Sequence, residues 1–268
     1  MNNYNERYKA EAAKYGKSDV IIAIVAFLFY TFWILGSSFL PINLDSFVGW
    51  QRTIISSLIT FCGTIPVFVF ILVKRRGLSS TGIKKEKLLP ALCLGMLVSL
   101  IPIFFGGILP IFMYGATFVS FDIMLIYISF TLIVAASEDL VFVGFIQPRL
   151  SGFFKKELVA IGIGSILFGF MHIPNWIYEG TLVLDVFSIL FVTVNWVGMH
   201  FMFVAIFKRH FSIFPVIMLH TISNLIVFGR LIDFPDGYYG NMELWLSLSF
   251  VIMLAAVGIW SVIMRRRR

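Results

Sequence analysis

Eight apolar runs follow one another along the 268-residue chain, and most are long enough to cross a lipid bilayer as helices. A transmembrane helix needs about 20 apolar residues, because the hydrocarbon core is ~30 Å thick. With 59% hydrophobic and only 13% charged residues, the chain is not a soluble domain. We predict an all-α fold, a polytopic membrane helical bundle of about eight transmembrane helices. The runs are Val20–Pro41, Thr53–Val73, Leu88–Leu109, Phe118–Gln147, Leu158–Ile173, Leu182–Phe207, Phe211–Phe228 and Leu244–Met264, of which the fifth and seventh are short.

The basic residues between these runs indicate an orientation. Of the 21 Lys and Arg residues, all except Arg52 and Arg230 lie on one side of the membrane if the N-terminus is cytoplasmic. Cytoplasmic segments of membrane proteins carry such an excess. The net charge of +7 therefore reflects topology, and we predict no nucleic-acid partner. We expect a multi-pass protein of a bacterial plasma membrane, with both termini cytoplasmic and the lipid bilayer as its surroundings.

The chain contains no internal repeat, no low-complexity tract and no long polar segment. We predict a single integral membrane domain over residues 1–268 with a short cytoplasmic N-terminal segment. The first run is too long for the core of a signal peptide, so we predict a retained helix. Residues 77–82 have the composition of a turn, and we expect them to form a solvated cytoplasmic loop.

Two adjacent carboxylates, Glu138 and Asp139, lie deep within the fourth run. An acidic residue at the centre of a membrane helix costs roughly 2.5–3.5 kcal/mol on insertion scales. Two such residues side by side indicate a use within the bundle. The alternative is a structural polar network that pairs with neighbouring helices.

Two further pairs have helical spacing. Phe168 and His172 are four residues apart, as are His220 and Asn224, so each pair shares a helix face. Counted from their cytoplasmic ends, Glu138 and His220 both lie about 14 Å deep, whereas His172 lies about 22 Å deep. His172 thus meets the others only if its helix starts deeper or tilts. Pro174 predicts that this helix ends near His172.

These residues resemble a known family. Glu138-Asp139 with Phe142 and Gly144, then Phe168-x-x-x-His172, then His220-x-x-x-Asn224 are similar in order and spacing to the three motifs of the CAAX protease and bacteriocin-processing family. Its members, also called the Abi family, are intramembrane glutamic endopeptidases. The family's first motif is Glu-Glu-x-x-x-Arg, and here Asp139 and Val143 depart from it. Val143 removes a cation that would face Asp139 one helical turn away, so we expect Asp139 to lack a partner.

The resemblance implies a type II CAAX prenyl protease-like activity. Glu138 and His172 would activate a water that attacks a peptide carbonyl, and His220 and Asn224 would stabilise the oxyanion. Asp139 and Phe168 would support them. A carboxylate beside an imidazole is a suitable general base, and fixed donors in a dry site stabilise developing charge. The resemblance implies no cofactor and a metal-independent hydrolase that cleaves a peptide or protein in or at the membrane.

Other functions remain open at this point. A catalytically impaired relative would act as a scaffold or regulator of a membrane or cell-wall partner, for instance in bacteriocin immunity. A proton- or ion-coupled transporter would use Glu138 and Asp139 as a relay, but paired repeats of broken helices are not recognisable. A metal site of Glu138, His172 and His220 has suitable ligands but no His-Glu-x-x-His spacing. We interpret His200 as a packing residue.

Overall fold

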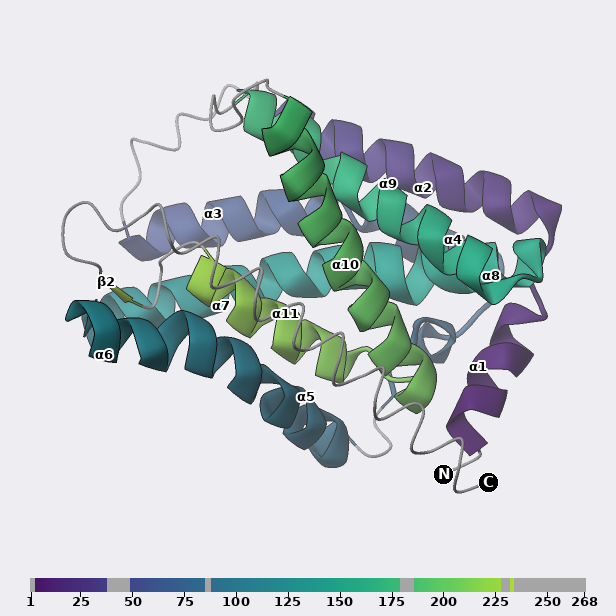
Figure 1. Cartoon of the computed structure of the whole chain (residues 1–268). Coiled ribbons are helices and arrows are strands. Elements are labelled where there is room, and N and C mark those ends of the chain that lie inside the picture. Colours follow the sequence, from purple (N-terminus) through teal and green to yellow (C-terminus); the bar gives the residue numbers. More distant parts are fainter. Residues whose placement is uncertain (1–2, 38–48, 85–87, 179–185, 228–231, 234–268) are drawn as a thin grey trace.

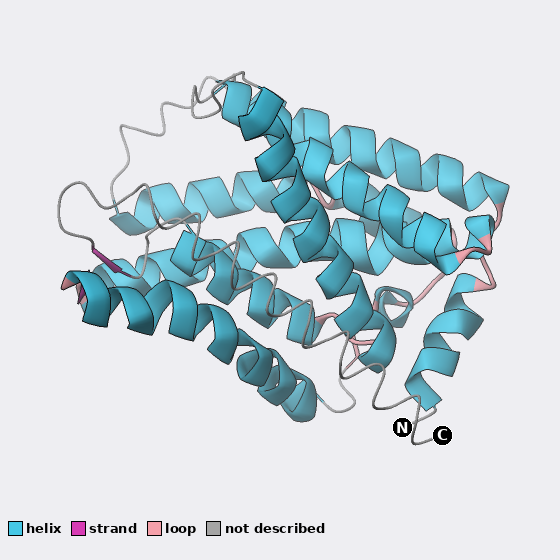
Figure 2. Ribbon diagram, in the orientation of Figure 1, coloured by secondary structure: helices cyan, strands magenta, loops and turns pink. Residues whose placement is uncertain are grey.

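The protein is a helical bundle, as Figure 1 and Figure 2 show for the computed structural model, which describes residues 3–37, 49–84, 88–178, 186–227 and 232–233. The predicted all-α class is confirmed. The only described strands, β1 (Thr117–Phe118) and β2 (Ile232–Asp233), form one short antiparallel pair. The helices are α1 (Asn3–Ala12), α2 (Lys17–Ser37), α3 (Gly49–Cys62), α4 (Ile65–Val73), the 3₁₀ helix η2 (Leu78–Thr81), α5 (Leu88–Ile103), the π-helix η3 (Phe104–Ile108), α6 (Leu109–Tyr114), α7 (Phe121–Asp139), the π-helix η4 (Leu140–Ile146), α8 (Gln147–Phe154), α9 (Glu157–Tyr178), α10 (Val186–His210) and α11 (Phe214–Val227).

Seven of the eight predicted runs coincide with helices, and the eighth, Leu244–Met264, lies outside the described residues. Among the described residues, three helices are long and apolar enough to span a membrane: α2, the stretch from α5 to α6, and the stretch from α7 to α8. A fourth span results if α3 and α4 count as one. α11 and the first part of α9 are shorter apolar helices. The protein is therefore a multi-pass membrane protein, while the number eight stays a prediction.

Proline explains where several helices change their geometry. Between α3 and α4 the axis bends by 43°, and Pro66 occupies the first turn of α4, where it needs no N–H partner. Both π-helices also end directly before a helix whose first turn contains a proline, Pro110 in α6 and Pro148 in α8. A proline cannot donate to the carbonyl four residues earlier, which favours a local change of hydrogen-bond register.

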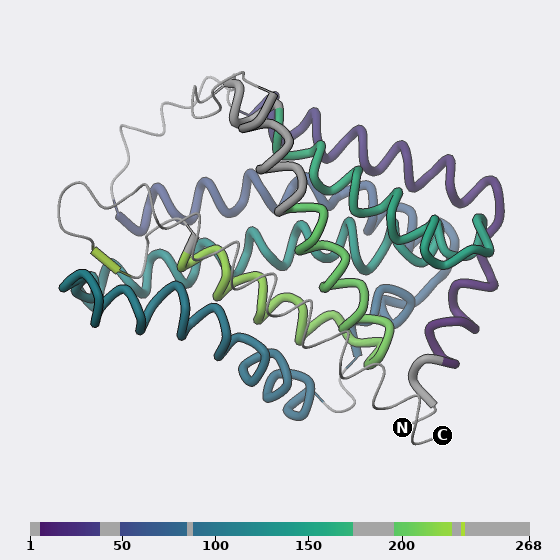
Figure 3. The backbone as a smooth tube through the Cα atoms, viewed as in Figure 1, coloured from purple at the N-terminus to yellow at the C-terminus, as the bar shows by residue number. Residues whose placement is uncertain are grey.

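The continuous stretch α7–η4–α8 is the central element of the bundle. Figure 3 shows it passing between the neighbouring helices, with α10 crossing the bundle obliquely. α3 and α11 pack on α7, whereas α2, α9, α10 and η2 contact η4. All seven residues of η4 are buried, and Gly144 permits the close approach of η2, since a Cβ there would lie 2.8 Å from the carbonyl oxygen of Thr81. The end of α7 is thus surrounded by protein, away from lipid.

Two segments that we expected on the cytoplasmic side are more ordered than the sequence predicts. The N-terminal segment, which we expected to be a short polar extension, forms α1, whose Tyr8 is buried and donates to or accepts from Ser151 at 2.8 Å. The loop at residues 77–82, which we expected to be solvated, contains the buried Thr81. The physical reason is the same in both cases, because apolar and aromatic surface from α8, α10 and η4 is available to cover them.

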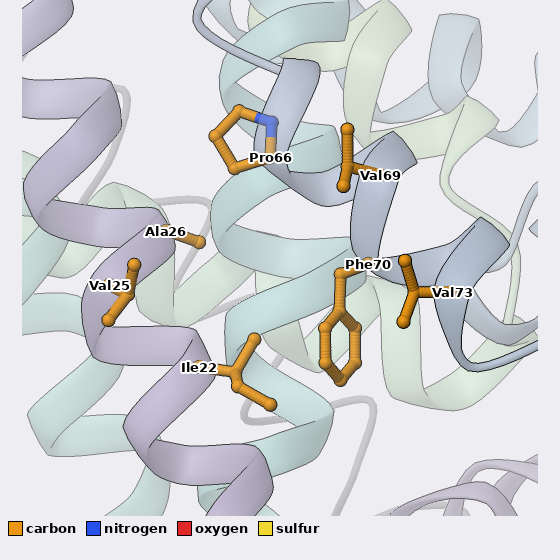
Figure 4. Close-up of a pocket in the computed structure, with 7 residues that line it drawn as sticks. All are labelled: Ile22, Val25, Ala26, Pro66, Val69, Phe70 and Val73. Atoms are coloured by element: carbon orange, nitrogen blue, oxygen red, sulfur yellow. The ribbon is translucent and has the colours of Figure 1, made fainter.

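An apolar groove lies on the outer flank of the bundle between α2 and α4 (Figure 4). Its lining side chains are all apolar, and several, such as Val25 and Val69, are half exposed. In a membrane such a surface faces lipid acyl chains. The residues that line the groove are Ile22, Val25, Ala26, Pro66, Val69, Phe70 and Val73. None of them has a side chain that could carry out acid-base or nucleophilic chemistry, so the functional site must be sought elsewhere.

Candidate functional site

The two adjacent acids lie where α7 passes into η4, near the middle of the 34-residue apolar span from Phe121 to Phe154. Consecutive helix residues point about 100° apart, so the two side chains can differ in exposure. Asp139 is completely buried. The Glu138 side chain keeps 13% of its surface exposed. Of the pair, only Glu138 can therefore be reached from outside the protein.

Two imidazole rings approach the Glu138 carboxylate from different helices. His172 of α9 places its Nε2 atom 3.9 Å from Oε2 of Glu138. His220 of α11 places its Nε2 atom 3.6 Å from the same oxygen. The structure therefore brings together three residues that are far apart in the sequence. They include His172, which we expected to reach the other two only if its helix started deeper or tilted. Both distances exceed a direct hydrogen bond.

The other nitrogen of each ring is anchored. Nδ1 of His172 donates to the backbone carbonyl of Phe168 at 2.9 Å, because a carbonyl can only accept. Nδ1 of His220 lies 3.1 Å from Oδ1 of Asp139, which accepts when the carboxylate is ionised. These two hydrogen bonds orient both Nε2 atoms toward the Glu138 carboxylate. A second partner that fixes the orientation of a catalytic imidazole is a common arrangement at functional sites.

Aromatic rings hold the two histidines in place. The ring of Trp196 stacks on His172 with 4.0 Å between centroids and an angle of 13° between planes. Phe168 is fully buried and contacts the rings of both His172 and His220. Phe168 was predicted as a supporting residue. Trp196 was not, since a single tryptophan in an apolar helix has no spacing that distinguishes it from packing residues.

The prediction that Asp139 lacks a partner is wrong. It assumed that the cation absent at Val143 was the only group available, one helical turn away on the same helix. His220 of α11 occupies that role from a different helix. Val143, four residues after Asp139, is fully buried in an apolar cluster and is part of the core. Sequence spacing within one helix could not reveal a partner that tertiary packing supplies.

Several buried polar atoms of the site have no hydrogen-bond partner among the described residues. They include Oε2 of Glu138, Oδ2 of Asp139, Nε2 of His220 and Oδ1 of Asn224. Asn224 is one helical turn from His220 on α11 and is 3% exposed. Buried polar groups are nearly always paired, so a cluster of unpaired ones marks a place for water or a ligand. Asn224 thus adds an unpaired polar atom one turn away from His220.

Two other sequence-based expectations concern histidines. From Pro174 we predicted that the helix ends near His172, but α9 continues to Tyr178. A proline inside a membrane helix is tolerated where neighbouring helices and local adjustments satisfy the backbone groups that it frees. His200 is fully buried, stacks on Phe168 and lies 3.1 Å from Oγ of Ser165 through Nδ1. Its surroundings agree with its interpretation as a packing residue.

The arrangement can bind and polarise a water molecule. A water oxygen can lie about 2.8–2.9 Å from each of two atoms that are 3.6–3.9 Å apart, so a water can bridge Oε2 of Glu138 and the Nε2 atom of either histidine. Within the described ranges, no group of three or more His, Cys, Asp or Glu side chains is arranged to hold a metal ion. Carboxylate, water and imidazole together are the components of general acid and base catalysis.

Comparison with known proteins agrees with the resemblance noted from the motifs. The family model for type II CAAX prenyl endopeptidases, Rce1-like, matches residues 120–226. The matched segment extends from the start of α7 to α11 and contains Glu138, His172, His220 and Asn224. No curated protein and no solved structure matches the chain. The resemblance to the CAAX protease family is thereby confirmed for the segment that forms the candidate site.

Proposed function

We propose that this chain, whose residues 120–226 belong to the Rce1-like type II CAAX prenyl endopeptidase family, hydrolyses a peptide bond with a water activated by Glu138 and His172. The family match by itself supports a CAAX-protease-like intramembrane endopeptidase. The observation that carries the finer proposal is the approach of His172 Nε2 and His220 Nε2 to one carboxylate oxygen, Oε2 of Glu138. That oxygen has no direct hydrogen-bond partner among the described residues.

The proposed reaction begins with the water held at Glu138. Its oxygen attacks the carbonyl carbon of the scissile peptide bond, while one of its protons passes to the Glu138 carboxylate, assisted by His172. The carbonyl oxygen becomes an oxyanion, for which His220 and Asn224 supply N–H donors. An amide group can turn by 180°, so Asn224 can present its NH₂ where Oδ1 now lies. The C–N bond then breaks, and the proton from Glu138 passes to the leaving amine.

Asp139 has a supporting role in this proposal. Because its carboxylate accepts the Nδ1–H of His220, the opposite nitrogen is directed at the site. A protonated His220 keeps an N–H on both nitrogens, one for Asp139 and one for the oxyanion. Asp139 thus takes the place, relative to His220, that the aspartate has in a Ser-His-Asp triad. No nucleophilic side chain is required, since the water attacks directly.

The substrate is expected to be a peptide or protein in or at the membrane. The family's name points to a prenylated C-terminal CAAX peptide, and this is the first probe to test. Bacterial relatives of this family also suggest bacteriocin processing or immunity, with a membrane or cell-wall protein as partner. We further propose a bacterial plasma membrane, both termini in the cytoplasm, and catalysis without a metal.

A cleavage assay tests the proposal. The purified protein in lipid nanodiscs is incubated with an internally quenched, farnesylated peptide that ends in a CAAX sequence. We expect cleavage by the unchanged protein, and none by Glu138→Gln or His172→Ala. The matched control is Glu6→Gln, which alters an exposed acid paired with Lys9 at 2.9 Å and is expected to retain full activity. Equal cleavage by Glu138→Gln and the unchanged protein would contradict the assignment.

The native substrate is sought in cells. Membrane proteomes of cells with the unchanged chain and with Glu138→Gln are compared, and a peptide that accumulates uncut in the variant is the expected result. This comparison works even if the farnesylated peptide is not the natural substrate class.

A non-proteolytic relative is the second candidate, and Val143 is the observation that favours it. The family motif has an arginine there, whereas this side chain is fully buried among apolar neighbours. Such a protein would bind and regulate a membrane or cell-wall partner. Glu138→Gln discriminates between the two, because it abolishes the cellular phenotype of a protease and leaves that of a scaffold intact.

The orientation is tested with topology reporters. A reporter fused after Arg268 is expected to be cytoplasmic, and one inserted at Asp236 external, from the distribution of basic residues. A cytoplasmic Asp236 would contradict the eight-helix prediction.

A further inference from the structure

Tyr30 of α2 is a buried tyrosine outside the segment that matches the family model. Its side chain is fully buried, and its hydroxyl has no hydrogen-bond partner among the described residues. A buried hydroxyl without a partner destabilises a protein, and native structures rarely keep one without a reason. Phenylalanine would fill the same space without that cost. The hydroxyl therefore requires an explanation.

The ring of Tyr30 occupies a closely fitted position. On one side it meets Phe142 of η4 edge to face, with 5.8 Å between centroids. On the other side lies Gly63, in the break between α3 and α4. A Cβ atom at Gly63 would lie 2.9 Å from both Cδ2 and Cε2 of the tyrosine ring, which is closer than atoms can pack. The glycine at the helix break thus makes room for this ring.

The hydroxyl is a donor near acceptors that lack donors. The Tyr30 ring contacts Phe142, which follows Glu138 by four residues, and Phe142 in turn contacts Phe168 beside the two site histidines. Oε2 of Glu138 and Oδ2 of Asp139 are themselves buried without hydrogen bonds in the described part of the chain. No direct hydrogen bond joins the hydroxyl to either acid among the described contacts. A water between them satisfies both partners, since it accepts from one group and donates to another.

We infer that Tyr30 is a positioning residue whose hydroxyl donates a hydrogen bond to the water that Glu138 activates. The inference rests on the proposed function. Donation from Tyr30 uses one lone pair of the water, one O–H of the water points to the Glu138 carboxylate, and the remaining lone pair is directed at the substrate carbonyl. Tyr30 keeps its proton throughout, so it orients the nucleophile without entering the proton transfers.

The test is Tyr30→Phe, which removes only the hydroxyl and keeps the ring. With the farnesylated CAAX peptide as substrate, we expect kcat to fall about tenfold to a hundredfold, the range expected when a reacting group is slightly misplaced. KM should change less than about twofold, because the substrate's own contacts are untouched. The midpoint of thermal unfolding should stay equal or rise, since an unpaired hydroxyl is lost.

Tyr8→Phe is the matched control. It also removes one buried tyrosine hydroxyl, but that hydroxyl pairs at 2.8 Å with Ser151 of α8, between α1 and α8. We expect a lower unfolding midpoint and an unchanged kcat, the opposite pattern to Tyr30→Phe. If Tyr30→Phe has unchanged kcat and a higher unfolding midpoint, the hydroxyl is merely an unpaired core group and the inference is overturned.

A second readout does not depend on turnover. The infrared carboxyl stretching band of Glu138 is identified as the band that disappears in Glu138→Gln. Loss of the shared water should shift this band in Tyr30→Phe and leave it in place in Tyr8→Phe. If the unchanged protein cleaves no peptide but the band shifts in Tyr30→Phe, the proposed substrate is wrong, while the link between the Tyr30 hydroxyl and Glu138 is supported. If the band does not move, the link between Tyr30 and Glu138 is refuted whatever the activity.

Discussion

Two glutamates with little exposed surface, Glu11 of α1 and Glu138 at the end of α7, have opposite surroundings. Glu11 accepts hydrogen bonds on both carboxylate oxygens, from the Tyr15 hydroxyl at 2.7 Å and from Nζ of Lys14 at 2.6 Å. Arg76 approaches it at 3.6 Å. Glu138 has two imidazole nitrogens at 3.6 and 3.9 Å but no hydrogen bond on Oε2 within the described contacts. Both oxygens of the Glu11 carboxylate are hydrogen-bonded within the fold, whereas Oε2 of Glu138 is not.

The surroundings of Glu11 show what a structural acid looks like in this protein. Burial is the largest cause that raises the pKa of Tyr15 to about 12, so its hydroxyl stays protonated and donates to Glu11. The guanidinium groups of Arg76 and Arg149 stack on the same tyrosine ring at 4.5 and 4.4 Å. This cluster joins α1 to the rest of the bundle. Satisfied polar groups stabilise, whereas unsatisfied ones at the same degree of burial indicate a function.

The largest effect should come from Glu138→Gln. It removes the general base while conserving size, so kcat/KM on the farnesylated peptide should fall by about 10²–10⁴-fold. Thermal unfolding in detergent should be little changed, because the carboxylate has no hydrogen bond to lose at Oε2. A large loss of stability with normal activity would reverse the comparison and make Glu138 the structural acid.

Asp139→Asn should reduce kcat/KM by about 10²–10³-fold. The amide cannot replace the carboxylate that accepts Nδ1–H of His220 and stabilises its protonated form. The peptide assay measures the change, and retention of the protein in the membrane fraction controls for folding. If this variant is as active as the unchanged protein, Asp139 belongs with Glu11 as a structural acid.

Val143→Arg should destabilise the protein and not restore a missing pair. The position is fully buried among apolar side chains, and an arginine at the centre of a membrane helix costs about 2.5–3.5 kcal/mol on insertion scales. A lower midpoint of thermal unfolding than in the matched Val143→Met variant checks this. A higher midpoint would mean that an acid of the site still lacks a cation.

Glu11→Gln should have the smallest effect, and only on stability. Loss of the charge-assisted hydrogen bond from Lys14 should lower the free energy of unfolding by about 1–3 kcal/mol. Activity per folded molecule should stay unchanged, since the described partners of Glu11 are Lys14, Tyr15 and Arg76, none of which belongs to the site. Lys14→Gln, which removes the other member of the pair, should produce a similar decrease. An effect of either variant on kcat would show that the two clusters are coupled.

Much of the fold followed from the length of the apolar runs, as the agreement of seven runs with helices shows. The site residues could be named because Glu138, His172, His220 and Asn224 have a motif order that does not depend on tertiary structure. Trp196 and Tyr30 could not be named, since each is a single aromatic residue in an apolar helix. Their roles arise from contacts between helices, and no spacing along one helix encodes them.

The sequence by itself determined the class of the molecule, because the bilayer requires long apolar helices and two adjacent acids within one are too costly to be incidental. Tertiary structure alone decided how those acids are used. His220 of α11 reaches Asp139 through Nδ1 and Glu138 through Nε2, and His172 of α9 approaches Glu138 from another helix. The physical reason is that the packing of α9 and α11 against α7, which no local pattern specifies, decides which side chains meet.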